Sequence, residues 1–141
     1  MTKLVHMMLR VLEEKRSVQF YSEALGLRVV ERLVFDDFTL VYMAVSCSST
    51  NASTDHHRFE LELTINHGRT EPYTLGDGYG HLAVSVDDLE KEHVRLQAAG
   101  HSITPIKTLD HNGKRVGQFF FLTDPDGYRI EILQRGASGR F

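Results

Sequence analysis

The chain has 141 residues, of which 41% are hydrophobic and 25% are charged, a balance typical of an ordinary globular protein. Its net charge of −3 and its isoelectric point near 6.2 argue against a nucleic-acid-binding protein, which usually carries a basic surface. No apolar run approaches the roughly 20 residues of a membrane span, the first residues lack a signal-peptide pattern, and the single Cys47 excludes an intramolecular disulfide. We therefore expect one cytoplasmic structural domain that binds neither nucleic acid nor membrane.

The chain contains two related halves. Residues 6–11 (HMMLRV) and 81–86 (HLAVSV) both begin with His and lie 75 positions apart. Each stretch leads through acidic residues into a helical pattern of apolar residues that stops at Gly26 or Gly100, a usual signal for the end of a helix. This repetition predicts two modules built on the same plan.

Each half is predicted to contain a strand, a helix and three further strands. The predicted strands are 5–11, 27–33, 39–45, 59–65, 81–86, 101–106, 117–122 and 128–133. The expected fold is α+β, with two βαβββ modules in tandem at 1–75 and 76–141, and with helices on the outer faces of curved mixed sheets.

Turn and cap signals complete this prediction. Asn112-Gly113 predicts a tight turn, and Asp87 followed by Glu90 resembles a capping box that would begin the second helix at Asp87. Residues 46–58 are expected to form a polar loop, and the tail from Gln134 is expected to fray.

Two His and two Glu occupy equivalent places in the two halves. Side chains alternate between the faces of a strand, so His6 and His81 lie opposite the apolar face of the first strand of each half. In the last strands, Glu62 and Glu131 each stand between two apolar neighbours and must point away from the helices. A single such residue is usually a surface residue, but four in repeated positions suggest a common task.

Two imidazoles and two carboxylates suit a divalent metal ion such as Zn, Ni, Co, Fe or Mn. Two open positions of an octahedral ion would let a substrate bind through two oxygens, and the ion would stabilise an enolate-type oxyanion. Glu60 shares the face of Glu62, so the residues alone leave open which of the two is the ligand in the first half.

Five segments carry a resemblance to a known family: 6–11 (HMMLRV), 16–26 (RSVQFYSEALG), 62–68 (ELTINHG), 78–81 (GYGH) and 124–131 (DPDGYRIE). They resemble glyoxalase I, the lactoylglutathione lyases, in its short bacterial form within the vicinal oxygen chelate superfamily. The resemblance extends over residues 4–133. The first and last segments occur widely in that superfamily, whereas 62–68 and 78–81 are more specific to glyoxalase I.

The resemblance implies that His6, Glu62, His81 and Glu131 bind one divalent metal ion per site, and it selects Glu62 over Glu60. It further implies a homodimer with two sites at its interface, each combining the first two ligands of one subunit with the last two of the other. Ni or Co is favoured because the chain lacks the extra segments of the Zn type, while Zn or Mn stays possible.

The implied activity is that of a carbon–sulfur lyase that detoxifies 2-oxoaldehydes. Such an enzyme isomerises the hemithioacetal of methylglyoxal and glutathione to S-lactoylglutathione through an enediolate. By resemblance Glu131 is the catalytic base and Glu62 its counterpart.

The resemblance also implies residues that bind the thiol co-substrate, glutathione. Arg10 and Asn66 would hold the glutamyl portion, and Lys114 or Arg115 would hold the glycine carboxylate, although neither basic residue aligns securely. His67 stands where the family commonly has an aromatic residue, so the identity of the thiol stays open.

Two other classes of function stay open on the same scaffold. One is a different metal-dependent reaction, such as thiol transfer, epimerisation or ring cleavage by a dioxygenase. The other is a metal-free protein that binds a small molecule.

Overall fold

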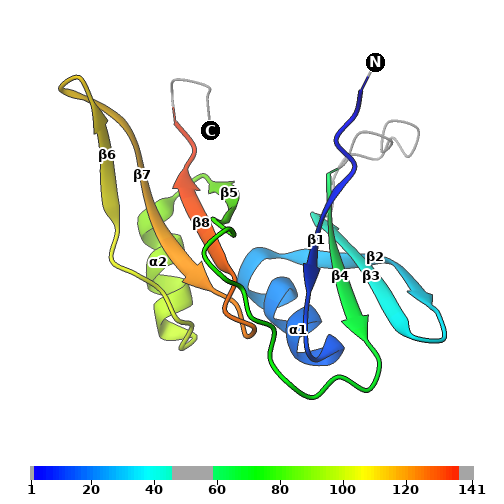
Figure 1. Ribbon diagram of the computed structural model, residues 1–141. Coiled ribbons are helices and arrows are strands. Elements are labelled where there is room, and N and C mark those ends of the chain that lie inside the picture. Colours follow the sequence, from blue (N-terminus) through cyan, green and yellow to red (C-terminus); the bar gives the residue numbers. More distant parts are fainter. Residues whose placement is uncertain (1, 46–58, 137–141) are drawn as a thin grey trace, which may run out of the picture. The chain divides into compact units, whose positions relative to one another are not determined.

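The computed structural model describes residues 2–45 and 59–136 (Figure 1). The predicted polar loop at 46–58, with Cys47, and the tail from residue 137 lie outside the described residues. The chain divides into two compact units, 1–74 and 75–141, and each is described by itself. Among the described residues, every helix is too short or too polar to cross a membrane.

The first unit is one four-stranded sheet with one helix. Its elements are β1 (His6–Arg10), α1 (Glu14–Leu25), β2 (Leu27–Val34), β3 (Phe38–Val45) and β4 (Glu60–Asn66). The strand order is β1-β4-β3-β2, in which β1 runs parallel to β4 and the other neighbours are antiparallel. Helix α1 ends at Gly26, whose positive φ of 68° is accessible to glycine at little cost.

The second unit repeats this plan. Its elements are β5 (Leu82–Val86), α2 (Leu89–Ala98), β6 (Lys107–His111), β7 (Lys114–Thr123) and β8 (Arg129–Gln134). The strand order is β5-β8-β7-β6, and again only the first pair is parallel. Two mixed sheets, each with its own helix, confirm the predicted tandem βαβββ fold.

The strand alternation separates a buried face from a polar face in both units. Val41 and Leu63 in the first unit, and Phe120 and Ile132 in the second, are fully buried with the helix side chains. The ring of His93 on α2 packs edge-on against Phe120 at 4.9 Å, which identifies this face as the one that the helix covers. The opposite face of each sheet carries the polar residues.

The predicted strand at 101–106 is wrong. Only an isolated bridge between Ile103 and Leu122 forms there, and the sheet strand is β6, which begins at Lys107, directly after the predicted range. Pro105 has no N–H to give to a ladder, and Asn112-Gly113 has positive φ at both positions (51° and 71°), as a type I′ hairpin turn requires. This turn pairs β6 directly with β7.

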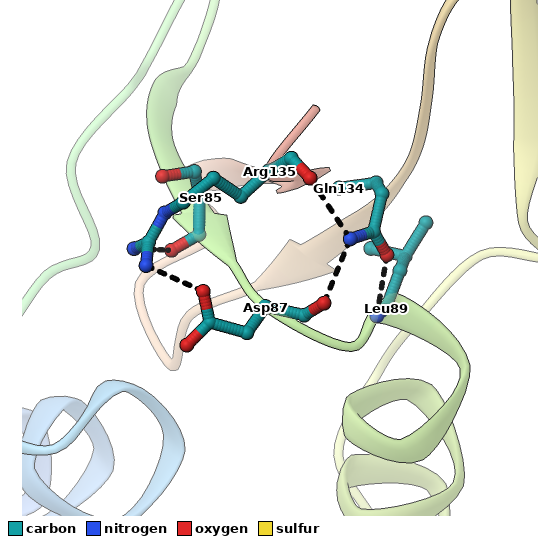
Figure 2. Close-up of polar contacts among 5 residues, drawn as sticks. All are labelled: Ser85, Asp87, Leu89, Gln134 and Arg135. Atoms are coloured by element: carbon teal, nitrogen blue, oxygen red, sulfur yellow. Dashed lines mark hydrogen bonds and ion pairs between the residues drawn. The ribbon is translucent and has the colours of Figure 1, made fainter. Parts of the chain in front are cut away.

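The predicted start of the second helix is wrong by one residue. Asp88, not Asp87, is the N-cap, and its Oδ1 accepts a hydrogen bond from the backbone N–H of Lys91 at 2.9 Å. Asp87 instead forms an ion pair with Arg135, as Figure 2 shows.

Two hydrogen bonds of the Gln134 side chain contradict the expected fraying at this residue. Its side-chain oxygen accepts from the N–H of Leu89 at 2.9 Å, and its amide donates to the carbonyl of Asp87 at 2.8 Å (Figure 2). The end of β8 is therefore tied to the turn between β5 and α2, and this turn follows the strand that begins next to His81.

Candidate functional site

The first donor pair lies on two parallel strands. His6 on β1 is opposite Glu60, and Met8 is opposite Glu62, so the imidazole reaches the carboxylate of Glu62 diagonally. The distance between His6 Nε2 and Glu62 Oε2 is 3.2 Å. Glu62 is buried (8% exposed) although it is a carboxylate, and such a group needs polar partners.

Two hydroxyl groups support the carboxylate of Glu62. Thr64 Oγ1, two residues along β4, donates to Glu62 Oε1 at 3.2 Å. Tyr42 lies directly opposite Glu62 in the β3–β4 register and forms a hydrogen bond to its side chain. Burial, followed by this hydrogen bond and the nearby carboxylate charge, raises the pKa of Tyr42 to about 12. Tyr42 has no local signal in the sequence, because its place beside Glu62 depends on the register of β3 against β4.

The second donor pair repeats the geometry of the first. His81 immediately precedes β5, where Ala83 is opposite Glu131, so the imidazole again reaches the carboxylate with a two-residue offset. The distance between His81 Nε2 and Glu131 Oε2 is 3.2 Å. Phe121 is the residue opposite Glu131 on β7, and its ring contacts that of His81 at 5.5 Å.

A tyrosine two residues before His81 binds the backbone of both neighbouring strands. The Tyr79 hydroxyl donates to the carbonyl of Arg129 at 3.0 Å and accepts from the N–H of Leu82 at 3.1 Å. It therefore bridges the starts of β5 and β8 next to His81. Burial raises the pKa of the Tyr79 hydroxyl, which remains a neutral donor at physiological pH. The GYGH segment signalled this residue, but not its contacts.

The spacing within each pair fits a shared divalent ion. Zn–N and Zn–O bonds measure about 2.0–2.2 Å, so two ligands at right angles around one ion are roughly 3.0 Å apart. The observed 3.2 Å in both pairs is close to that value. No group of three or more His, Cys, Asp or Glu side chains that could hold a metal ion occurs within residues 2–45 and 59–136. Each unit by itself therefore presents two candidate ligands, one His and one Glu.

The residues expected to bind the thiol lie at one end of the first sheet. Arg10 is the last residue of β1 and Asn66 the last of β4, so both strands reach as far as the prediction required. The Asn66 amide donates to the Tyr73 hydroxyl at 2.7 Å, and the Arg69 guanidinium lies 4.1 Å above the Tyr73 ring. Arg69 and Tyr73 are polar neighbours that the sequence analysis missed.

The other candidate residues lie elsewhere. Lys114 and Arg115 begin β7 at the hairpin turn, and roughly 20 Å of extended strand separates Arg115 from Phe121, the neighbour of Glu131. Within one unit they are far from the donor pair. His67 contacts Thr39 Oγ1 through Nε2 at 2.9 Å, and its Nδ1 donates to the carbonyl of Asp36 at 3.0 Å. Both ring nitrogens of His67 are thus engaged in holding the loop between β2 and β3.

Comparison with known proteins places this architecture in a family. The family model described as the Glyoxalase/Bleomycin resistance protein/Dioxygenase superfamily matches residues 3–132. The lactoylglutathione lyase of Pseudomonas aeruginosa is 36% identical, with 95% of this chain and 83% of that protein covered. The lactoylglutathione lyase of Salmonella typhimurium is 31% identical, with 98% of this chain and 96% of that protein covered.

Solved structures agree. The trypanothione-dependent glyoxalase I of Leishmania major superposes with a TM-score of 0.71 at 33% identity, covering 95% of this chain and 87% of that one. Glyoxalase I from Zea mays gives a TM-score of 0.76 at 28% identity, and this chain spans 45% of its length. An antibiotic-binding protein from a Streptomyces species shares the fold alone, at 18% identity and a TM-score of 0.68. The chain therefore belongs to the glyoxalase/bleomycin resistance protein/dioxygenase superfamily and, within it, to the glyoxalase I family of lactoylglutathione lyases.

Proposed function

We propose that this protein is a lactoylglutathione lyase, which isomerises the hemithioacetal of methylglyoxal and glutathione to S-lactoylglutathione. The observation that carries the proposal is the repeated His–Glu pair, with the same diagonal offset and the same 3.2 Å spacing in both units. The relatives at 31–36% identity that carry this activity in their names support the same reaction. The cytoplasmic location expected from the sequence is part of the proposal.

We infer that His6, Glu62, His81 and Glu131 together hold one divalent ion, with Ni or Co favoured over Zn and Mn. When bound, the ion supplies Lewis-acid stabilisation of the negative charge that develops on two neighbouring oxygens of the substrate. Both imidazoles and both carboxylates are needed, because either pair alone would leave the ion mostly to water. The 3.2 Å spacing of each pair supports this donor set without a large rearrangement.

Glu131 is proposed to be the base. Its carboxylate takes the proton from the carbon that carries sulfur and hydroxyl, next to the substrate carbonyl. It then returns the proton to the former carbonyl carbon, while the hydroxyl proton passes to the former carbonyl oxygen. The hydroxyl-bearing carbon thereby becomes the thioester carbonyl carbon, and no atom is gained or lost. Exclusion of water by the bound substrate would keep the transferred proton from being lost to solvent. Phe121, opposite Glu131, offers an apolar surface that supports such exclusion.

Arg10 and Asn66 are proposed to bind the glutamyl end of glutathione. They end neighbouring parallel strands, four residues beyond His6 and Glu62 respectively, which is roughly 13 Å along an extended strand. A tripeptide thiol whose sulfur lies at the ion can extend over that distance. Lys114 or Arg115 would then hold the glycine carboxylate, and a charge-assisted pair of this kind favours arginine.

The reaction is tested with protein purified without a chelating tag and loaded in turn with Ni²⁺, Co²⁺, Zn²⁺ and Mn²⁺. We expect thioester formation from methylglyoxal and glutathione with Ni²⁺ or Co²⁺, and loss of activity when a chelator removes the ion. Bound metal without thioester formation would instead favour another reaction on this fold. The absence of stoichiometric metal would favour a small-molecule-binding protein.

The proposed homodimer is tested by mixing two inactive variants, His6→Ala and His81→Ala. If each site takes one pair from each subunit, a mixed dimer contains one doubly damaged site and one intact site. Random mixing then restores about a quarter of the wild-type activity, by the arithmetic of a statistical dimer. If both pairs of a site come from one chain, no mixed species has an intact site, and activity does not return.

A further inference from the structure

We propose that Tyr42 is a positioning residue that fixes Glu62 as the stationary carboxylate of the site. The inference rests on the proposed function and adds to it, because the motifs that carry the family resemblance do not include Tyr42. It concerns the difference between two carboxylates that stand in equivalent places of the repeat.

The first carboxylate is held from two strands. Tyr42 forms its hydrogen bond from β3, directly opposite Glu62, and Thr64 donates to Oε1 from β4 itself. Glu62 Oε2 meanwhile lies 3.2 Å from His6 Nε2. One carboxylate oxygen is thus tied by a hydroxyl while the other faces the imidazole, and the buried group has little freedom to rotate.

Tyr42 is suited to donate rather than to accept. Glu31 on β2 is its opposite neighbour on the other side, and Glu60 and Glu62 lie on β4. An ionised carboxylate can only accept hydrogen bonds, so a phenol that faces these carboxylates is the donor. The His6 ring lies edge-on to the Tyr42 ring at 5.8 Å, so the tyrosine contacts both members of the first pair.

The second carboxylate has different neighbours at the matching positions. Phe121 occupies the place of Tyr42, and Leu133 occupies the place of Thr64 two residues after the Glu. Neither side chain carries a hydroxyl. The Phe121 ring instead lies under the Arg129 guanidinium at 3.8 Å. Glu131 therefore receives no hydroxyl support from these two positions, although its distance to His81 equals that of the first pair.

This difference matches what the reaction asks of the two groups. One carboxylate must stay in place throughout, and the other must give up its position to carry a proton. Hydrogen bonds from neighbouring side chains make the first task easier and the second harder, because they hold a ligand in one orientation. Tyr42 and Thr64 thus favour the stationary role for Glu62 and leave the moving role to Glu131.

The experiment compares Tyr42→Phe with Phe121→Tyr, which exchange the hydroxyl between the two halves, and uses Tyr21→Phe as the control. Tyr21 is a fully buried tyrosine in α1 and is not part of either donor pair. Ni²⁺ affinity is measured by competition with a chelator, the Co²⁺ absorption spectrum reports the ligand geometry, and kcat and KM are measured at saturating Ni²⁺.

We expect Tyr42→Phe to weaken Ni²⁺ binding about 10- to 100-fold and to change the Co²⁺ spectrum, as loss of a group that orients a ligand does. At saturating Ni²⁺, the kcat of Tyr42→Phe should be close to that of the wild type. Phe121→Tyr should bind Ni²⁺ no more weakly than the wild type. Its kcat should fall about tenfold or more, because the new hydroxyl forms a hydrogen bond that holds the charged Glu131 in one position. Tyr21→Phe should leave the Ni²⁺ affinity unchanged.

Ni²⁺ binding by Tyr42→Phe within twofold of the wild type overturns the inference while the proposed function stands. An equal loss in Tyr21→Phe also overturns it, because the effect then reflects general stability. If Tyr42→Phe does not fold, Thr64→Val is measured in its place, and an unchanged Ni²⁺ affinity there has the same meaning. A wild-type chain that binds none of Ni²⁺, Co²⁺, Zn²⁺ and Mn²⁺ overturns the proposed function itself.

Discussion

The two units present the same His–Glu pair and support it in different ways. In the first unit, the backbone N–H of Glu60 donates to the carbonyl of Val5 at 3.1 Å. The hydrogen bonding between β4 and β1 therefore extends past His6. In the second, β5 begins after His81, and the hydroxyl of Tyr79 bridges the strands instead. The repeat therefore keeps the geometry of the donor atoms, while the neighbouring side chains differ between the two copies.

The largest expected effect comes from replacing the two equivalent carboxylates, Glu131 and Glu62, one at a time. Glu131→Gln removes the proposed base but keeps the shape of the side chain, and it should lower kcat by about 10²- to 10⁴-fold at saturating metal. Glu62→Gln should mainly reduce Ni²⁺ affinity, by at least about tenfold more than Glu131→Gln does, because the stationary ligand is lost. Steady-state kinetics and chelator competition on both variants measure the two quantities.

These variants serve as controls for each other, since both replace one carboxylate by an amide in equivalent strands. Equal losses of kcat and of affinity would contradict the division of roles. A larger loss of kcat at saturating metal in Glu62→Gln would reverse the assignment and make Glu62 the base.

An intermediate effect is expected from the different supports of the two histidines. Tyr79→Phe removes both hydrogen bonds that hold the start of β5 to β8, and should weaken Ni²⁺ binding about tenfold through a less well placed His81. The free energy of unfolding should fall by about 1 kcal/mol, the usual value for a lost hydrogen bond. Denaturant unfolding and metal competition check the two values. Unchanged affinity would show that β5 holds His81 without the tyrosine.

The sequence predicts the donor atoms better than their supports. The two-residue period of a strand decides the face of His6, Glu62, His81 and Glu131, and the repeat decides which of them are equivalent, so both conclusions need only local information. Tyr42 could not be found this way. It becomes a partner of Glu62 only through the register of β3 against β4, and the segment that joins these strands, 46–58, is too long to set that register by turn geometry.

The errors in the second unit have a similar origin. The β-rich pattern at 101–106 competed with the hairpin signal of Asn112-Gly113, and the hairpin prevails because both turn residues adopt positive φ there. The local sequence predicts a frayed tail from Gln134, because the partners of this residue, Leu89 and Asp87, are 45 and 47 residues away in the chain. Contacts of that range follow from the sheet order and not from a local pattern.

The smallest expected effect tests the helix starts that follow the two histidine strands. Asp88 caps α2 through its side chain, whereas Glu13, the N-cap of α1, forms no side-chain cap. Asp88→Ala should therefore cost about 1 kcal/mol of unfolding free energy, and Glu13→Ala, the matched control, should cost much less. Denaturant unfolding of both variants gives the difference. Because neither residue belongs to a donor pair, Ni²⁺ affinity should stay unchanged in both. If Asp88→Ala weakens Ni²⁺ binding as well, the β5–α2 turn shown in Figure 2 also helps to position His81, and the support of the second histidine extends beyond Tyr79.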